Sequence, residues 1–268
     1  MTMVLKDRLD HLRGIVRTEK KVKVTELSQR FDVTEETIRR DLERLELEGL
    51  ITRTHGGAVL KVENMFDRLG YIHRSRTNVE EKKKIAQIVA SIIPMQATLF
   101  ADASSTVMEA LTLMADREDI TVLTNSIPVL SSLNQSGLNI MSTGGANNRV
   151  SCSLQGIIAR STIMNYHVDF VLTSCKGLKL EEGAYDSREG ETEIKQLMIS
   201  RGQRTIMMAD HSKFDRTSFV KYCNFQQIDI LVTDRRPADE WMELFEEYQI
   251  HVLYPEAEDV YIKETGNS

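Results

Sequence analysis

Seven short apolar runs recur in the last two thirds of the chain, and segments with helical spacing separate them. The runs span residues 98–101, 121–124, 139–142, 169–173, 205–209, 228–233 and 251–254. Continuous apolar runs between helices are typical of strands that helices bury on both faces, as in a parallel sheet. The pattern therefore predicts an α/β fold with a mostly parallel, Rossmann-like sheet.

Polar and glycine residues follow four of these runs. They are Asp102, Ser104, Ser105 and Thr106 after the first run, Asn125 and Ser126 after the second, Gly144 and Gly145 after the third, and Lys213 after the fifth. The carboxyl ends of parallel strands meet at one edge of a sheet, where ligands bind. Hydroxyl and main-chain N–H groups at helix N-termini bind anions. We therefore expect a small phosphate-bearing ligand at this edge, although each motif alone also fits a helix cap or a turn.

The first 60 residues have a different pattern, in which three helical segments precede a glycine-tipped hairpin. Apolar residues at helical spacing predict a helix over about residues 3–18. Thr25 is expected to cap a second helix, and Thr34 to cap a third that ends at Gly49. Two helices joined by a short turn and followed by a hairpin predict a winged helix-turn-helix domain.

The third helix has a predicted buried stripe and an exposed face. Ile38, Leu42 and Leu45 recur at helical spacing and form the stripe. Polar side chains near the start of a recognition helix meet DNA bases and phosphates. The DNA-binding candidates of helix and hairpin are Thr25, Thr34, Thr37, Arg39, Arg40, Arg44, Arg53 and His55. The alternative is that the arginines are only solvated surface, and Glu35 and Glu36 would repel phosphates unless they are held aside.

Charge is unevenly distributed along the chain. Residues 1–84 hold 19 basic and 15 acidic residues, whereas the remainder holds 15 and 25. A net charge of +4 on the head and −10 on the body suggests a polyanionic partner for the head alone. Chance clustering on two solvated surfaces is the alternative.

Composition and spacing divide the chain into four parts. Residues 1–60 are the winged-helix domain, 61–78 a linker of mixed charge, 79–255 the sheet domain and 256–268 an acidic tail. The sheet domain begins with a helix whose lysine run at 82–84 we interpret as a solvated face.

The sequence argues against several classes of protein. No apolar run is long enough to cross a membrane, and the N-terminus lacks the apolar core of a signal peptide. Cys152, Cys175 and Cys223 lie far apart, which argues against a disulfide framework or a zinc site. We therefore expect a cytoplasmic protein without a metal or a cofactor.

The motifs of head and body together resemble the DeoR-type family of bacterial transcription regulators. The matching segments include residues 24–27, 31–34, 37–42 and 53–58 in the head, and 102–106, 124–126, 144–145, 193–195 and 210–214 in the body. The resemblance implies DNA binding through Thr37, Arg39 and Arg40. It also implies a ribose-5-phosphate-isomerase-like effector domain that holds a sugar phosphate with the 102–106 loop and Lys213.

Two departures from the family pattern leave the ligand open. Ser104 stands where the family usually has glycine, which tolerates φ > 0 and close backbone approach better than serine does. Residues 174–177 read Ser-Cys-Lys-Gly, where the family more often has Gly-Ala-x-Gly. An altered ligand, or a lost one, is therefore the alternative.

Three functions fit these observations, and we expect the first. It is a transcription regulator, and we expect a repressor of carbohydrate genes. It binds repeated operator half-sites as a homo-oligomer (dimer or tetramer) and responds to a phosphorylated sugar. The second is a sugar-phosphate isomerase with an appended DNA-binding domain, for which Glu191, Glu193 and Lys195 supply acid–base groups. However, the run Asp-Gly-Ala-Asp-Glu of such enzymes does not follow the 169–173 strand. The third is a scaffold whose helix-turn-helix binds protein.

Overall fold

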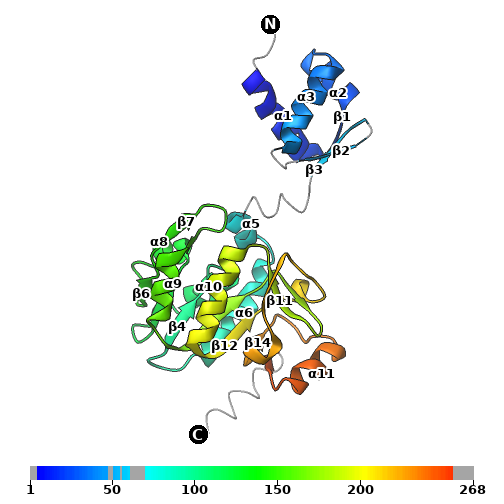
Figure 1. The fold of residues 1–268 in the computed structure, drawn as a ribbon. Coiled ribbons are helices and arrows are strands. Elements are labelled where there is room, and N and C mark those ends of the chain that lie inside the picture. The colour runs from blue at the N-terminus through cyan, green and yellow to red at the C-terminus, as the bar shows by residue number, and fades with distance from the viewer. Residues whose placement is uncertain (1–4, 48–50, 55, 61–69, 256–268) are drawn as a thin grey trace. The chain divides into compact units, whose positions relative to one another are not determined.

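The structure is a computed structural model that describes residues 5–47, 51–54, 56–60 and 70–255 (Figure 1). The chain divides into two compact units, Met1–Leu69 and Gly70–Ser268, and each is described by itself. Residues 70–78, for which the sequence predicts a linker, belong to the second unit. The rest of the expected linker and the expected tail lie outside the described residues.

The first unit is a winged helix-turn-helix, as the sequence predicts. Its helices are α1 (Leu5–Glu19), α2 (Val24–Phe31) and α3 (Glu35–Leu47), and its antiparallel strands lie in the order β1 (Lys21–Lys23), β3 (Gly57–Leu60) and β2 (Ile51–Thr54). The core includes Leu12, Leu27, Ile38, Leu42, Leu45 and Ile51. The sequence does not predict β1, because lysines flank its one apolar residue, Val22, and leave no apolar run.

The turn between α2 and α3 is closed by backbone geometry and by one hydroxyl group. Asp32 adopts the left-handed conformation with φ of 49°, and its N–H bonds to the last turn of α2. Thr34 Oγ1 accepts the Thr37 N–H at 3.3 Å, as expected of an N-cap. The expected cap at Thr25 is wrong: α2 begins at Val24, two residues earlier than such a cap predicts, and Lys23 at the cap position makes no side-chain cap bond.

The second unit is built on a seven-stranded parallel sheet, and each of the seven predicted runs forms one of its strands. In spatial order they are β15 (His251–Leu253), β14 (Ile230–Val232), β12 (Gly202–Met208), β9 (Val168–Ser174), β4 (Thr98–Ala101), β5 (Thr121–Thr124) and β6 (Asn139–Ser142). From β4 the chain builds outward to β6 on one side and from β9 to β15 on the other. The pair β4 and β9 is therefore the topological switch point of the sheet.

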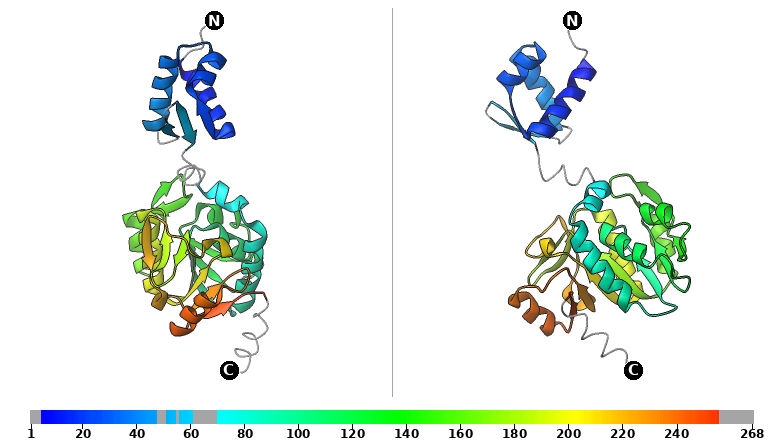
Figure 2. Two further views of the ribbon diagram at one scale, coloured as in Figure 1. Left: turned by 90° about the vertical axis from the view of Figure 1, so that its right-hand side faces the viewer. Right: turned by 180° about the vertical axis from the view of Figure 1, so that it is seen from behind.

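Helices cover both faces of this sheet because successive strand residues point to opposite faces (Figures 1 and 2). One hydrophobic core lies on the face of the sheet to which Leu99 points, and the other lies on the opposite face, to which Phe100 points. The first core is completed by α6 (Val79–Ile92), α7 (Ser105–Leu113) and α8 (Ile127–Ser132); the second by α9 (Ile157–Met164), α10 (Glu189–Arg201) and α11 (Asp239–Glu247).

Smaller elements that the sequence does not predict surround the carboxyl edge of the sheet. They are α5 (Gly70–Arg76), the hairpin of β7 (Ala146–Asn148) and β8 (Ser153–Gln155), and an antiparallel sheet of β10 (Gly177–Lys179), β11 (Gly183–Asp186) and β13 (Val220–Cys223). The N–H of Tyr71 in α5 donates to Val150 O at 3.1 Å, which fastens α5 beside the hairpin. None of the described helices is both long and apolar enough to cross a membrane.

A buried ion pair joins α1 to α3 and gives a test of the first unit. Arg8 Nε lies 2.7 Å from Asp41 Oδ2, and both residues are buried. We predict that Arg8→Met destabilises α3 by about 3–5 kcal/mol, because Asp41 is left as an uncompensated buried charge. Hydrogen exchange of the α3 amides in the full chain measures this loss. Glu43→Met, an exposed site on the same helix, is the control, and equal protection in both variants would contradict the prediction.

Candidate functional site

Helix α3 turns its arginines away from the core. Arg39, Arg40 and Arg44 are exposed, as is the capping residue Thr34, whereas Thr37 is half-buried. The side chain of Arg40 is 73% exposed, and that of Arg39 is 48% exposed. The predicted buried stripe occupies the opposite face, so the predicted polar face is free to meet a partner.

The two glutamates of α3 are engaged by its arginines. Arg39 Nη2 donates to Glu35 Oε2 at 2.6 Å, and Arg40 Nε lies 3.5 Å from Glu36 Oε1. Exposed ion pairs of this kind contribute at most about 1 kcal/mol. A phosphate can therefore compete for either arginine, and the glutamates do not block this face.

The hairpin formed by β2 and β3 lies beside α3. The N–H of Arg53 in β2 donates to Glu46 Oε1 of α3 at 3.0 Å and ties the strand to the helix. A groove between these elements is lined by Val24, Arg39, Leu42, Arg53, Thr54, Gly56 and Gly57. Arg39 and Arg53, two of the arginines predicted to bind DNA, therefore line the same groove. Thr25 is exposed on α2, and His55 lies outside the described residues.

Asp102, at the switch point of the sheet, has its carboxylate turned into the protein. It is 1% exposed, and it accepts the Ser104 N–H at 2.8 Å, the Thr173 hydroxyl at 2.9 Å and the Ser174 N–H at 3.0 Å. Thr173 and Ser174 end β9, so Asp102 fixes the loop after β4 to the neighbouring strand. Its oxygens are thus engaged within the protein, although the sequence predicts that it binds the ligand.

A buried lysine lies against Asp102, and the sequence does not predict its position. Lys195 of α10 donates to Ser174 O at 2.5 Å and to Asp186 Oδ2 at 2.6 Å, and its Nζ lies 3.2 Å from Asp102 Oδ2. Burial alone would lower the pKa of Lys195, but the two carboxylates raise it well above its ordinary value. The group therefore remains an ammonium ion that crosslinks the strand ends.

Ser104 caps α7 in an ordinary backbone conformation. Its φ is −84° and its ψ is 150°, and its Oγ accepts the Val107 N–H at 3.2 Å. No left-handed conformation is required here, so serine fits where the family usually has glycine. Ser105 and Thr106 are buried in the first turn of the same helix, and Ser126 caps α8 in the same way at 3.4 Å.

Three buried oxygens at the strand ends have no hydrogen-bond partner among the described residues. They are Asn125 Oδ1, after β5, Asp210 Oδ2, after β12, and Thr233 Oγ1, after β14. Lys213 Nζ lies 3.8 Å from Asp210 Oδ2, and a quarter of the lysine side chain is exposed. Since buried polar atoms are almost always paired, these oxygens mark a position where a ligand or water supplies donors.

Gly144 and Gly145 shape the loop after β6 through their backbone. Their φ values are 64° and 112°, and a Cβ on Gly145 would lie 2.5 Å from Gln155 O. The positive φ of both residues favours glycine, and at Gly145 the close approach of Gln155 O also excludes a side chain. The pair forms the turn that brings this loop against β8.

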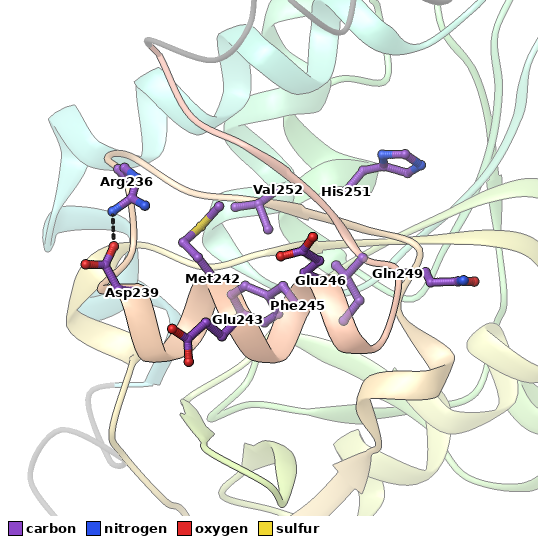
Figure 3. A pocket seen from close by; sticks show the side chains of 10 residues that line it. Arg236, Asp239, Met242, Glu243, Phe245, Glu246, Gln249, His251 and Val252 are labelled. Atoms are coloured by element: carbon purple, nitrogen blue, oxygen red, sulfur yellow. Dashed lines mark hydrogen bonds and ion pairs between the residues drawn. The ribbon is translucent and has the colours of Figure 1, made fainter.

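A separate hollow lies between α11 and the edge strand β15 (Figure 3). Its lining includes the carboxylates of Asp239, Glu243 and Glu246, and Asp239 already accepts from Arg236 at 2.7 Å. An excess of carboxylates disfavours a phosphate, so the strand ends at the switch point are the better candidate. Within the described ranges, no cluster of His, Cys, Asp or Glu is arranged to hold a metal ion.

The crosslink made by Lys195 can be tested by its removal. Lys195→Met leaves two buried carboxylates without a counter-ion, and we predict a loss of about 3–5 kcal/mol in the free energy of unfolding of the second unit. Urea unfolding followed by the fluorescence of Trp241, which is buried in this unit, measures the change. Gln196→Met, the exposed neighbour on α10, should change little. An unaltered unfolding midpoint for Lys195→Met would contradict this account.

Two family models match the chain, one for each unit. The DeoR-like helix-turn-helix domain matches residues 8–63, and the DeoR C terminal sensor domain matches residues 77–235. The sensor match alone covers more than half of the chain.

Curated relatives align over most of the chain and most of their own length. The uncharacterized HTH-type transcriptional regulator YulB of Bacillus subtilis is 37% identical over 87% of this chain and 90% of its own. The HTH-type transcriptional repressor GlcR of the same species is 31% identical over 96% and 99%. The L-fucose operon activator of Haemophilus influenzae is 32% identical over 88% and 94%. With both domain models and these relatives in agreement, the chain belongs to the DeoR family of DNA-binding transcriptional regulators.

Proposed function

We propose that this regulator represses carbohydrate metabolism genes in the cytoplasm and that a phosphorylated sugar controls its affinity for the operator. The observation that supports this most is the unpaired buried oxygen of Asp210, Oδ2, which lies 3.8 Å from Lys213 Nζ, and a further unpaired oxygen, Asn125 Oδ1, follows another strand of the same sheet. Acceptors beside an ammonium group suit a ligand that carries hydroxyl groups and an anion. A sugar phosphate has both.

The phosphate would lie at the first turn of α7. Main-chain N–H groups of a helix N-terminus favour an anion, and Ser104, Ser105 and Thr106 are the residues present there. Lys213 supplies positive charge from the loop after β12. Asn125 and Asp210 then accept hydroxyl groups of the sugar.

DNA recognition is assigned to α3 and the wing. Arg40 would read a base from the exposed face of α3, while Arg39 and Arg53 would hold phosphates from their shared groove. One winged helix makes too few contacts for high specificity, so we expect a dimer or tetramer on repeated half-sites. Steeply salt-dependent binding to duplex DNA would separate this function from that of a protein scaffold.

Control follows from linkage between the two sites. A ligand can bind the protein more tightly in one arrangement of the DNA-binding units than in another. It then shifts the operator affinity, at most by the ratio of its affinities for the two arrangements. Among the relatives, GlcR is a named repressor and the fucose protein a named activator. We propose that this chain is a repressor and that the ligand releases it from the operator.

An isomerase activity is the rival proposal, and the buried charges favour a regulator. Lys195 is held charged between two carboxylates and is not a base. The carboxyl of Glu191 is buried. This burial, and then the charge of Asp186, raise its pKa. Glu193 lies 2.8 Å from Arg160 in an exposed ion pair. Turnover of ribose, fructose or hexosamine phosphates above background would overturn this conclusion.

The DNA interface predicts different effects for two arginines. Arg40→Ala should lower operator affinity by about 1–3 kcal/mol and relax the preference at one base position, whereas Arg53→Ala should weaken binding to all sequences and reduce the salt slope by about 1. Fluorescence anisotropy with DNA from upstream of the protein's own gene measures both. Lys84→Ala, exposed on α6, is the charge-matched control. Unchanged operator affinity for Arg40→Ala would refute the assignment of this face.

The effector site predicts a response that depends on Lys213. One or more compounds from a panel of sugar phosphates should release the operator, and Lys213→Ala should raise the concentration for half-release about tenfold or more, because a charged hydrogen bond contributes about 1.5–3 kcal/mol. Operator affinity without the compound should not change. Lys221→Ala, exposed on β13, is the control. Release by none of the compounds would rule out control by the sugars tested, and full release from Lys213→Ala would remove this lysine from the site.

A further inference from the structure

The two edges of the parallel sheet differ in charge. The sheet ends in β15 on one side and in β6 on the other. Beside β15, α11 presents the carboxylates of Asp239, Glu243 and Glu246 (Figure 3). By contrast, residues 120–148, which include β5, α8 and β6, contain no Asp, Glu, Lys or Arg, although these types make up 28% of the chain. Charged side chains commonly protect a sheet edge from pairing with another chain, and β6 carries none.

The backbone of β6 has hydrogen-bonding groups that point out of the sheet. Among the described strands, β6 pairs with β5 alone. The N–H groups of Asn139 and Thr143 donate toward β5 at 3.0 Å. Because alternate residues of a parallel strand turn their N–H and C=O groups to the same side, those of Ile140 and Ser142 point away from β5. Two donors and two acceptors are therefore presented at this edge.

Helix α9 adds an apolar side chain to the same end of the sheet. Helices α8 and α9 flank β6 on opposite faces (Figure 1). Ile158 of α9 is 65% exposed, and a Cβ on Gly144, in the loop after β6, would lie 3.4 Å from Ile158 Cγ2. Arg160, almost opposite Ile158 around the helix, lies 2.8 Å from Glu193 of α10. Helix α9 thus turns its charge toward α10 and Ile158 toward the β6 edge.

We propose that the β6 edge, with α9 beside it, binds a second copy of this chain about a two-fold axis at Met141. The two β6 strands pair antiparallel, with Ile140 of each opposite Ser142 of the other, and continue the sheet across the dimer. In a two-fold contact each residue at the axis meets its own copy, so a charge there faces a like charge. The uncharged edge meets this condition, and interface centres are depleted of charge in general.

This inference rests on the proposed function, which expects a dimer or tetramer on repeated half-sites, and it names the surface by which two copies join. A strand of another protein is the other occupant that an exposed edge accepts. In that case the chain would be a monomer by itself, so the oligomeric state of the full chain distinguishes the two.

Sedimentation velocity of the full chain, 30.6 kDa per copy, tests the inference. Wild type should sediment as a dimer or tetramer. Asn139→Lys on β6 and Ile158→Lys on α9, both at exposed positions, should sediment at half its mass. Each places like charges in an uncharged contact and should raise the dissociation constant about tenfold or more. Met95→Lys, at a position that is 83% exposed between α6 and β4, should sediment as wild type.

Hydrogen exchange gives a second measurement, which locates the contact. The outward amides of Ile140 and Ser142 should be protected in wild type and exchange rapidly in Ile158→Lys. The amide of Leu99, in the central strand β4, should stay protected in both and shows that the variant is folded. Rapid exchange of Ile140 and Ser142 in the wild-type oligomer would overturn the inference.

The remaining outcomes separate this inference from the proposed function. A monomeric wild type, or lysine variants that both keep the wild-type mass, would show that β6 is not the interface. The half-mass variants should bind DNA with one half-site as wild type does, and lose the preference for two. If the lysine variants halve the mass but wild type binds no operator, the interface stands and the proposed function fails.

Discussion

One buried ammonium group organises the carboxyl edge of the sheet. Lys195 contacts Asp102 after β4, Ser174 at the end of β9 and Asp186 at the end of β11, so three segments far apart in the sequence meet on one charge. The crosslink spans the switch point, where open α/β sheets bind their ligands. Because Asp102 is engaged within the protein, we propose that recognition depends on the groups that remain: the first turn of α7, Asn125, Asp210 and Lys213. Strand ends that are crosslinked by Lys195 and carry a few unpaired polar atoms are suited to binding a small ligand.

The two units use charge in opposite ways. On α3 the arginines are exposed and their glutamate partners hold them weakly, so DNA phosphates can take the place of the glutamates. In the second unit the charges that matter are buried. There Lys195 has two carboxylate partners, whereas Lys82 faces a second lysine and has a lowered pKa of about 8. The first arrangement suits a polyanion on the surface, and the second suits a small anion beside buried charges.

The sequence predicted the large elements because their patterns are long or repeated. All seven strands of the parallel sheet follow from apolar runs, and the stripe of Ile38, Leu42 and Leu45 follows from helical spacing. Strand β1 and the strands β10, β11 and β13 were not predicted, because a charged residue stands in each of them and leaves no continuous apolar run. The position of Lys195 depends on contacts between distant segments. The lysine run at 82–84 looks uniform in sequence, and only the burial of Lys82 against the carbonyls at the end of α5 distinguishes it from its neighbours.

The central claim is that one ligand site and one operator site share a coupling free energy. Linkage requires the coupling to be reciprocal, so the most direct measurement is calorimetric titration of a releasing sugar phosphate into the free protein and into the protein saturated with operator DNA. The account predicts weaker binding to the operator complex, by the same factor by which the compound lowers operator affinity. Equal affinity for the free and the operator-bound protein would contradict it, because a ligand that does not distinguish the two states cannot control the operator.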